Sequence, residues 1–390
     1  MTPDSDATGR ALDVIRALSV DIGPRRPCSD AEKSAALLLE HWLTERGVEA
    51  RREPFRGYST FGLPYGLIMA GALAAGLLQR RGRRTGDLLA PLSLAIAALE
   101  SDLRFTLLSK VLARAPSVNV VARVPAAAEP RRTVCLCGHL DTTRSGLIFH
   151  PRVVPHLKAL LQLPGASGAL LAAGPLLRRL PYGKALQAGA LWGMVLSLGL
   201  LAERELRGVD VPGANDNASG AAVAAQLAAE CAANPLAHTE VHLLVTSCEE
   251  SGLLGAQAYA REHAQEAGST TFVNFDTVGG DLPLTYILRE GGPSQFRPAS
   301  ARLVALAETI AARRPDLGLV PAQTTPGLPT DATVFLARGW EAITFLAQSE
   351  QGIPHYHLPS DTFATVSGDA VARALDTGRE MLRELDRRAG

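Results

Sequence analysis

The stretch VHLLVTSCEESGLLG, residues 241–255, carries the pattern that decides the fold. Its first part, Val241 to Thr246, is a short apolar run rich in β-branched residues and is predicted to be a buried strand. Two adjacent carboxylates, Glu249 and Glu250, follow the strand, and a helical pattern begins near Leu253. A strand, an acidic loop and a helix in this order are typical of α/β folds, in which sites form beyond the carboxyl ends of strands.

The same alternation extends along the chain in both directions. Strands are predicted at 118–124, 133–137, 241–246, 271–275 and 342–346, and helices at 221–233, 253–266, 299–313 and 369–387. Residues 29–32 have the form of a capping box, and Ala35, Leu38, Leu39 and Trp42 follow with helical spacing. We therefore predict an α/β layer fold with a largely buried sheet.

Composition and charge exclude several classes of protein. With 390 residues, of which 47% are hydrophobic and 20% charged, the chain is long enough to bury a sizeable core. Lys and Arg together number 39, as do Asp and Glu, so no net basic field is available to hold nucleic acid. The five cysteines include no C-x-x-C pair, which favours buried thiols in a reducing compartment over disulfides. The N-terminus lacks the basic-then-apolar pattern of a cleavable export signal.

Two long apolar stretches interrupt the alternation. No charged residue occurs in 57–79, 88–99, 159–177 or 185–202. A basic connector joins the first two of these segments and another joins the last two, so we expect two apolar helical hairpins. A membrane-spanning helix needs roughly 20 apolar residues, a length that the segment 88–99 does not reach.

Two interpretations of these hairpins stay open. The segments are rich in Ala and Gly, and Pro164 and Pro175 interrupt the third, which suits buried helices in a soluble, cytoplasmic protein. The basic tips favour membrane association instead. In a spanning arrangement, the positive-inside rule would put the tips in the cytoplasm and the rest of the protein on the opposite side.

Five short segments place carboxylates or imidazoles at or near the ends of predicted strands. In chain order they are CGHLD (137–141), GANDNASG (213–220), TSCEESGLLG (246–255), VNFDTVGG (273–280) and HYHLPSDT (355–362). Taken singly, each also suits a surface loop or a helix cap. Together they offer the nitrogen and oxygen ligands that zinc takes without any thiolate. Of two adjacent glutamates, one can bind a metal while the other acts as a general base.

This ordered set resembles the zinc-dependent exopeptidases of metallopeptidase family twenty-eight, and the likeness runs from Thr133 to Val366 with one interruption. The resemblance implies a zinc-exopeptidase-like, three-layer α/β sandwich with a mixed, mostly parallel central sheet and two apolar helical hairpin insertions. It also implies a single peptidase domain over residues 1–390, interrupted at 57–103 and 147–207. The segment Ile22-Gly23-Pro24-Arg25 looks like the lead-in usual for the family.

The resemblance further implies a role for each site residue. Two zinc ions would be held by five ligands: His139, Asp216, Glu250, Asp276 and His357. Asp216 would bridge the ions, with His139 and Asp276 on one of them and Glu250 and His357 on the other. Asp141 would orient His139, and Glu249 would be the general base that takes a proton from a shared water and returns it to the leaving amine.

The sequence departs from the family pattern at several points. The connection from His139 to Asp216 is longer than is usual, and the second apolar hairpin fills the excess. Leu358 stands where Thr usually follows the ligand histidine, and Ala332 stands where many members have His. His355 is an alternative ligand to His357, which we prefer for its spacing to the Asp-Thr pair that follows.

These observations lead to one principal hypothesis and two alternatives. The principal one is a two-zinc aminopeptidase that hydrolyses N-terminal residues from peptide substrates. The alternatives are a glutaminyl cyclase-like acyltransferase with a single zinc and a non-catalytic, membrane-bound interaction protein on the same fold. The intact set of candidate ligands argues against the last, because a scaffold has no need for clustered carboxylates. No nucleic-acid partner is expected, and the oligomeric state, the residue specificity and the native metal stay open.

Overall fold

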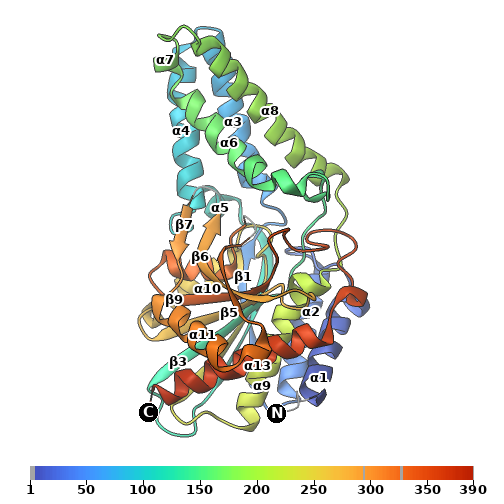
Figure 1. Ribbon diagram of the computed structural model, residues 1–390. Coiled ribbons are helices and arrows are strands. Elements are labelled where there is room, and N and C mark those ends of the chain that lie inside the picture. The colour runs from blue at the N-terminus through green and yellow to red at the C-terminus, as the bar shows by residue number, and fades with distance from the viewer. Residues whose placement is uncertain (1–4, 293–294, 326–327, 390) are drawn as a thin grey trace.

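A nine-stranded sheet runs through the body of the molecule, with helices on both faces, and a helical unit projects from one end (Figure 1). The computed structural model describes residues 5–292, 295–325 and 328–389. Residues 1–4, which belong to the N-terminal stretch without an export-signal pattern, lie outside the described residues.

The sheet is parallel at its centre and antiparallel towards its edges. Its strands are β1 (Ala50–Gly57), β2 (Ala115–Val124), β3 (Arg132–His139), β4 (Thr239–Thr246), β5 (Thr270–Asp276), β6 (Leu284–Gly292), β7 (Gln295–Pro298), β8 (Val320–Thr324) and β9 (Glu341–Ala347). They lie in the order β1-β2-β4-β3-β5-β9-β6-β7, and β8 pairs with β6. The neighbours β4, β3, β5 and β9 run parallel, and β2 runs antiparallel to β1 and β4. Strand β6 runs antiparallel to β9 and β7 but parallel to β8.

Two helical layers cover the sheet. One face carries α1 (Ser5–Arg16), α2 (Asp30–Thr44), α9 (Gly220–Ala233), α11 (Ala301–Arg313) and α13 (Gly368–Arg387), and the other carries α10 (Leu254–Glu262) and α12 (Asp331–Ala337). Small side chains let α9 lie close to the sheet: a Cβ added at Gly138 of β3 would come within 2.8 Å of the backbone of α9. The prediction of a mixed, mostly parallel sheet between helical layers is confirmed.

Several edge elements were not predicted from the sequence. In β1, with the sequence ARREPFRG, most side chains are at least partly exposed, so this edge strand has no apolar run by which it could be recognised.

The capping box at the start of α2 is formed only in part. Ser29 Oγ accepts from the N–H of Glu32, but the carboxylate of Glu32 is buried and turns to other partners.

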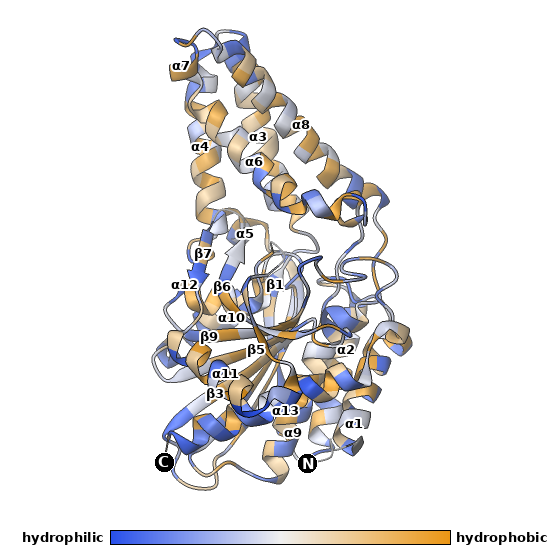
Figure 2. Ribbon diagram, viewed as in Figure 1, coloured by the Kyte–Doolittle hydropathy of each residue, from blue (hydrophilic) through white to orange (hydrophobic). Residues whose placement is uncertain are grey.

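The two predicted apolar hairpins are present as a projecting helical unit, defined here as residues 62–101 and 157–207. It contains α3 (Gly62–Arg80), α4 (Arg84–Ser101), α6 (Leu157–Ala172), α7 (Gly174–Leu177) and α8 (Gly183–Arg207). Hydrophobic residues run along these helices, and hydrophilic residues gather at the far tip (Figure 2). By length and composition, α3 and α8 are long and apolar enough to cross a membrane. The short α5 (Leu107–Leu112) follows the first hairpin.

Arg25 ties the N-terminal segment to the centre of the sheet. Its side chain is fully buried, and its guanidinium donates hydrogen bonds of 2.7–2.9 Å to the carbonyl oxygens of Leu18, Gly23, Leu140, Pro212 and Gly213. Burial lowers the pKa of Arg25 to about 10, so the group stays charged at neutral pH. The five carbonyls belong to segments on both sides of the two apolar hairpins in the sequence.

We expect Arg25→Lys to lower the free energy of unfolding by about 2–4 kcal/mol, because an ammonium cannot reach five carbonyls and leaves buried acceptors unsatisfied. The urea unfolding midpoint measures this loss. Arg51→Lys on the edge strand β1, where the arginine side chain is 57% exposed, is the matched control and should leave the midpoint unchanged. Equal midpoints for Arg25→Lys and the wild type would contradict this account of the segment.

Candidate metal centre

Three parallel strands end at one edge of the sheet and deliver four of the predicted site residues there. His139 is the last residue of β3 and Asp276 is the last residue of β5, while Glu249 and Glu250 lie in the turn after β4. Because β3 lies between β4 and β5 in parallel register, the three strand ends meet side by side.

The segment Ala214–Ser219 brings in Asp216 just before α9. Asp361 holds this segment in place: its carboxylate accepts from the backbone N–H groups of Asn215 at 2.8 Å and Asp216 at 3.0 Å. Asn217 Oδ1 accepts from the N–H of Thr277 at 3.0 Å, directly after Asp276. The polar side chains that the sequence suggested as a helix cap therefore tie Asp216 to the end of β5.

Asp141 lies behind the site and is fully buried. Its two carboxylate oxygens accept from the N–H groups of Glu249 at 3.0 Å and Glu250 at 2.9 Å. His139 Nδ1 lies 3.1 Å from the backbone carbonyl oxygen of Asp141 and 3.7 Å from its carboxylate. The contact that orients the imidazole is thus made by the Asp141 backbone, which leaves Nε2 of His139 free to face the site.

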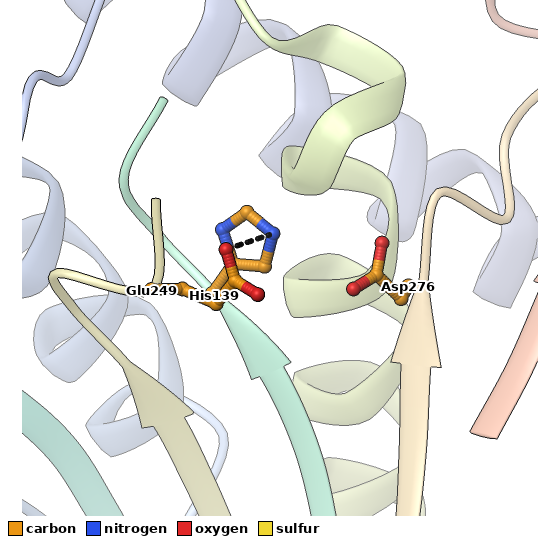
Figure 3. A group of neighbouring side chains, drawn as sticks. All are labelled: His139, Glu249 and Asp276. Atoms are coloured by element: carbon orange, nitrogen blue, oxygen red, sulfur yellow. Dashed lines mark ion pairs between the residues drawn. The ribbon is translucent and has the colours of Figure 1, made fainter. Parts of the chain in front are cut away.

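The side chains form two adjoining triads. One contains His139, Glu249 and Asp276, and the other contains Asp216, Glu250 and His357; within each triad the candidate ligand atoms lie within 4.8 Å of one another. Figure 3 shows the first triad, with Glu249 beside His139 and Asp276 facing them from the end of β5. His139 Nε2 lies 3.3 Å from Asp216 Oδ1, and His357 Nε2 lies 3.1 Å from Asp216 Oδ2.

All five predicted ligands and the predicted base therefore converge, and the remaining histidine of the last motif does not. His355 is exposed and bonds to Ser360 Oγ at 2.8 Å. His357 is buried, and the rings of Phe149 and Tyr356 pack against it with centroid distances of 4.3 Å and 3.9 Å. Phe149 follows the β3 motif but carries no motif of its own, so no sequence signal pointed to it.

The donor set fits a divalent cation. Asp216 Oδ2 and Glu250 Oε1 are buried and lie 3.1 Å and 3.4 Å from His357 Nε2, but neither oxygen accepts a hydrogen bond of normal geometry among the described residues. Buried carboxylate oxygens are rarely left in this state, and a cation in contact with them would remove the cost. Nitrogen and oxygen ligands without a thiolate suit zinc. Asp141 and Asp361 accept hydrogen bonds from the backbone beside the candidate ligands, so they hold these residues in place and leave the ligand atoms free to bind a metal ion.

The electrostatics of the site also favour a bound cation. Burial raises the pKa of Glu250 to about 7 and that of Asp276 to about 6. Burial also raises the pKa of Glu249 well above its ordinary range. For Asp216 burial acts in the same direction, but the imidazoles of His139 and His357 outweigh it and hold the pKa below the ordinary range. The four carboxylates of the triads outnumber the two imidazoles.

Residues outside the predicted set line the cavity above the triads. They are Thr325, Leu328, Pro329, Thr330, Leu346 and Tyr356. Most come from the segment between β8 and α12, which has no motif of charged or imidazole side chains. Only the tertiary structure brings these lining residues next to the two triads.

Comparison with known proteins is consistent with this geometry. A family model described as peptidase family M28 matches residues 197–382. Residues 197–382 belong to peptidase family M28. This segment includes Asp216, the two adjacent glutamates, Asp276 and His357.

Individual relatives extend the M28 comparison. The aminopeptidase YwaD of Bacillus subtilis is 27% identical over 173 residues, which cover 42% of this chain and 36% of YwaD. Among solved structures, the Bacillus subtilis zinc aminopeptidase BSAP matches with a TM-score of 0.58 and 15% identity, covering 97% of this chain and 95% of that one. A glutaminyl cyclase from Porphyromonas gingivalis matches with a TM-score of 0.59 and 13% identity, covering 97% and 98%. At these identities the structural matches establish the shared fold.

We expect Asp216→Asn to lose most of its bound zinc after dialysis against buffer, because the substitution removes a charge that faces both triads. Metal content per chain, measured by mass spectrometry of the digested protein, checks this. Asp281→Asn is the control, since its carboxylate is 85% exposed and outside the site. Retention of zinc by Asp216→Asn at the wild-type level would show that the triads are not the metal site.

Proposed function

We propose that this chain is a zinc-dependent aminopeptidase that holds two ions. The observation that carries the proposal is the pair of adjoining triads, each of which contains one of the adjacent glutamates. Asp216 belongs to one triad and lies 3.3 Å from His139 of the other. His139 and Asp276 would hold one ion, Glu250 and His357 the other, and Asp216 would contact both. When bound, such ions supply Lewis-acid chemistry that polarises a carbonyl and lowers the pKa of a water.

The chain's own residues would then manage the proton. Glu249 lies next to the ligands, and its Oε2 is 3.9 Å from His139 Nε2. We assign it as the general base that takes a proton from the attacking water and delivers it to the leaving amine nitrogen. Asp141 acts as a positioning residue, because its carboxylate fixes the backbone on both sides of the Glu249–Glu250 peptide bond.

Relatives support exopeptidase rather than endopeptidase activity. The matching proteins YwaD and BSAP are both named aminopeptidases, and we carry that activity over to this chain as part of the proposal.

Glutaminyl cyclase activity is the second candidate, since enzymes of that name share the fold. One triad would be enough for a single ion. The additional triad of His139, Glu249 and Asp276 favours two ions and hydrolysis. A peptide with an N-terminal glutamine distinguishes the two reactions, because hydrolysis releases free glutamine whereas cyclisation leaves the peptide bond intact and releases ammonia.

We expect Glu249→Gln to lower kcat for amino-acid p-nitroanilides by at least about 100-fold while the bound zinc is retained, because the amide cannot accept the proton. Wild-type and variant protein would be zinc-loaded and compared over a panel of substrates. Glu262→Gln, at the end of α10 and outside the site, is the control.

Two results would overturn this assignment. Full activity of Glu249→Gln would remove the proposed base. If Glu249→Gln lost both zinc and activity, Glu249 would be a metal ligand rather than the base. Its carboxylate lies in the first triad, so the metal content must be measured together with the activity.

We further propose that the projecting helical unit inserts into a lipid bilayer, with the sheet and its two helical layers outside it. Most of the large apolar side chains that lie exposed among the described residues belong to this unit. Leu88 and Trp192 are 74% and 73% exposed, and two thirds of the apolar windows of α3 and α8 are not buried. A core helix of a soluble protein would be mostly covered.

The interior of the unit is built as membrane helix bundles are built. Its centre contains Ala72, Ala75, Ala90 and Ala190, and a Cβ added at Gly76 would come within 2.7 Å of Leu191. Small residues inside and large apolar ones outside are typical of helices packed in lipid. At 1.5 Å per residue, the 19 residues of α3 span about 28 Å, close to the roughly 30 Å of a hydrocarbon core.

The basic residues at the tip of the projecting unit also support a lipid bilayer as the partner. The connector between α3 and α4 contributes Arg80, Arg81, Arg83 and Arg84 to the tip, and the connector before α8 contributes Arg178, Arg179 and Lys184. The segments without charged residues, 57–79, 88–99, 159–177 and 185–202, lie between this tip and the body. Basic residues at one end of an apolar belt suit the anionic cytoplasmic leaflet.

We expect the wild-type chain to stay with the membrane fraction after an alkaline carbonate wash and to be released by detergent. The triple variant Leu88→Lys, Trp192→Lys, Leu196→Lys should shift to the aqueous fraction, because three exposed apolar positions become charged. Leu37→Lys on α2, at a position 51% exposed on the body, is the matched control and should not shift. A wild-type chain found in the aqueous fraction without detergent would contradict the proposal, and its oligomeric state would show whether a second copy covers these helices.

A further inference from the structure

We infer that Cys28 and Cys248 are a disulfide-forming pair that links the N-terminal segment to the turn carrying Glu249. The inference concerns side chains that neither triad uses, and it stands whether or not the chain is an aminopeptidase. It also departs from the sequence-based prediction, which favoured buried thiols in a reducing compartment over disulfides.

The two sulfurs are already in contact. Cys28 Sγ and Cys248 Sγ lie 3.4 Å apart although the residues are 220 positions apart in the sequence, and both thiols are free. A disulfide bond is about 2.0 Å long, so bond formation requires a movement of little more than 1 Å. A contact between sulfurs this distant in sequence is produced by the fold alone.

The surroundings hold both cysteines in position. Glu32 accepts from the backbone N–H of Cys28 at 2.9 Å and from that of Cys248 at 3.0 Å, so one buried carboxylate fixes both backbones. Gly57 leaves room for the sulfurs, since a Cβ there would lie 3.1 Å from each of them. Both cysteines have left-handed backbone angles, with φ of 61° and 57°, which non-glycine residues seldom adopt.

One of the two thiols is accessible. Cys28 is half-buried and lies on the wall of an open cavity of about 450 Å³, which Arg26 and Arg114 also line. Cys248 is fully buried behind it. The hydrogen bond from the Cys248 thiol lowers the pKa of Cys28, which increases its thiolate fraction. Cys28 is therefore the attacking thiol and Cys248 the resolving one.

The oxidant we name is a small disulfide such as oxidised glutathione. The Cys28 thiolate attacks one of its sulfurs, a mixed disulfide forms at Cys28, and one glutathione thiolate leaves and is protonated by water. Cys248 then attacks Cys28 Sγ, and the second glutathione departs with the Cys248 proton. In total, two protein thiols are oxidised by two electrons and one small disulfide is reduced to two thiols.

The link would act on the site through the backbone. Cys248 directly precedes Glu249, and the turn that they share is otherwise held by hydrogen bonds to Asp141 and Glu32. A covalent bond across 220 positions restricts the unfolded chain far more than the folded one. The oxidised protein should therefore be the more stable form.

The test uses the purified full chain equilibrated in glutathione buffers from reducing to oxidising. Free thiols are counted after denaturation, and linked peptides are identified by mass after digestion. We expect the wild type to fall from five thiols to three, to yield a Cys28–Cys248 peptide, and to unfold several degrees higher when oxidised. Dithiothreitol should reverse all three changes.

Two variants make the result specific. Cys28→Ser should keep its remaining thiols and show no oxidation-dependent shift, whereas Cys231→Ser, which removes a cysteine of α9, should still form the link. The inference is overturned if the wild type keeps five thiols under oxidising conditions. It is also overturned if glutathione stays on Cys28 without a link or if another pair becomes joined.

Discussion

Negative charge buried at the ends of parallel strands is the constraint around which this structure is organised. The triads place carboxylates close together at one edge of the sheet, where they are removed from water and have too few cationic partners. Like charges in such a position raise one another's pKa and destabilise the fold unless a cation lies among them. The arrangement is understandable only as a binding site, because a packed sheet edge could be built from uncharged residues.

A second set of buried polar groups holds this charge in place by hydrogen bonds to the backbone. Asp141 accepts from two consecutive N–H groups in the glutamate turn, and Asp361 accepts from two in the segment before α9. Arg25 performs the complementary task by donating to five carbonyls. These side chains are saturated by their partners, so the facing atoms of the triads are left for a metal ion.

The projecting helical unit follows a different rule of packing from the body. In the body, large apolar side chains such as Phe272 and Phe335 are buried between sheet and helices. In the projecting unit, a small core combines four alanines with Leu171, Leu191 and Met194, and many other large apolar side chains lie exposed. The exposed apolar side chains of the projecting unit are the observation on which the proposed contact with lipid rests.

The sequence by itself predicted the alternation of strands and helices, the carboxylates at or near strand ends, the two apolar hairpins and the residues of the triads. These features could be predicted because hydrophobic patterns and ligand residue types are local properties of the chain. The sequence could not predict the polar edge strand β1, which has no apolar run, or the cavity-lining residues Thr325, Leu328, Pro329 and Thr330, which form no chemical motif. Only the tertiary structure decided which groups meet: the contact between Cys28 and Cys248 depends on the packing of distant segments. Long-range contacts of this kind leave no periodic signal in the chain.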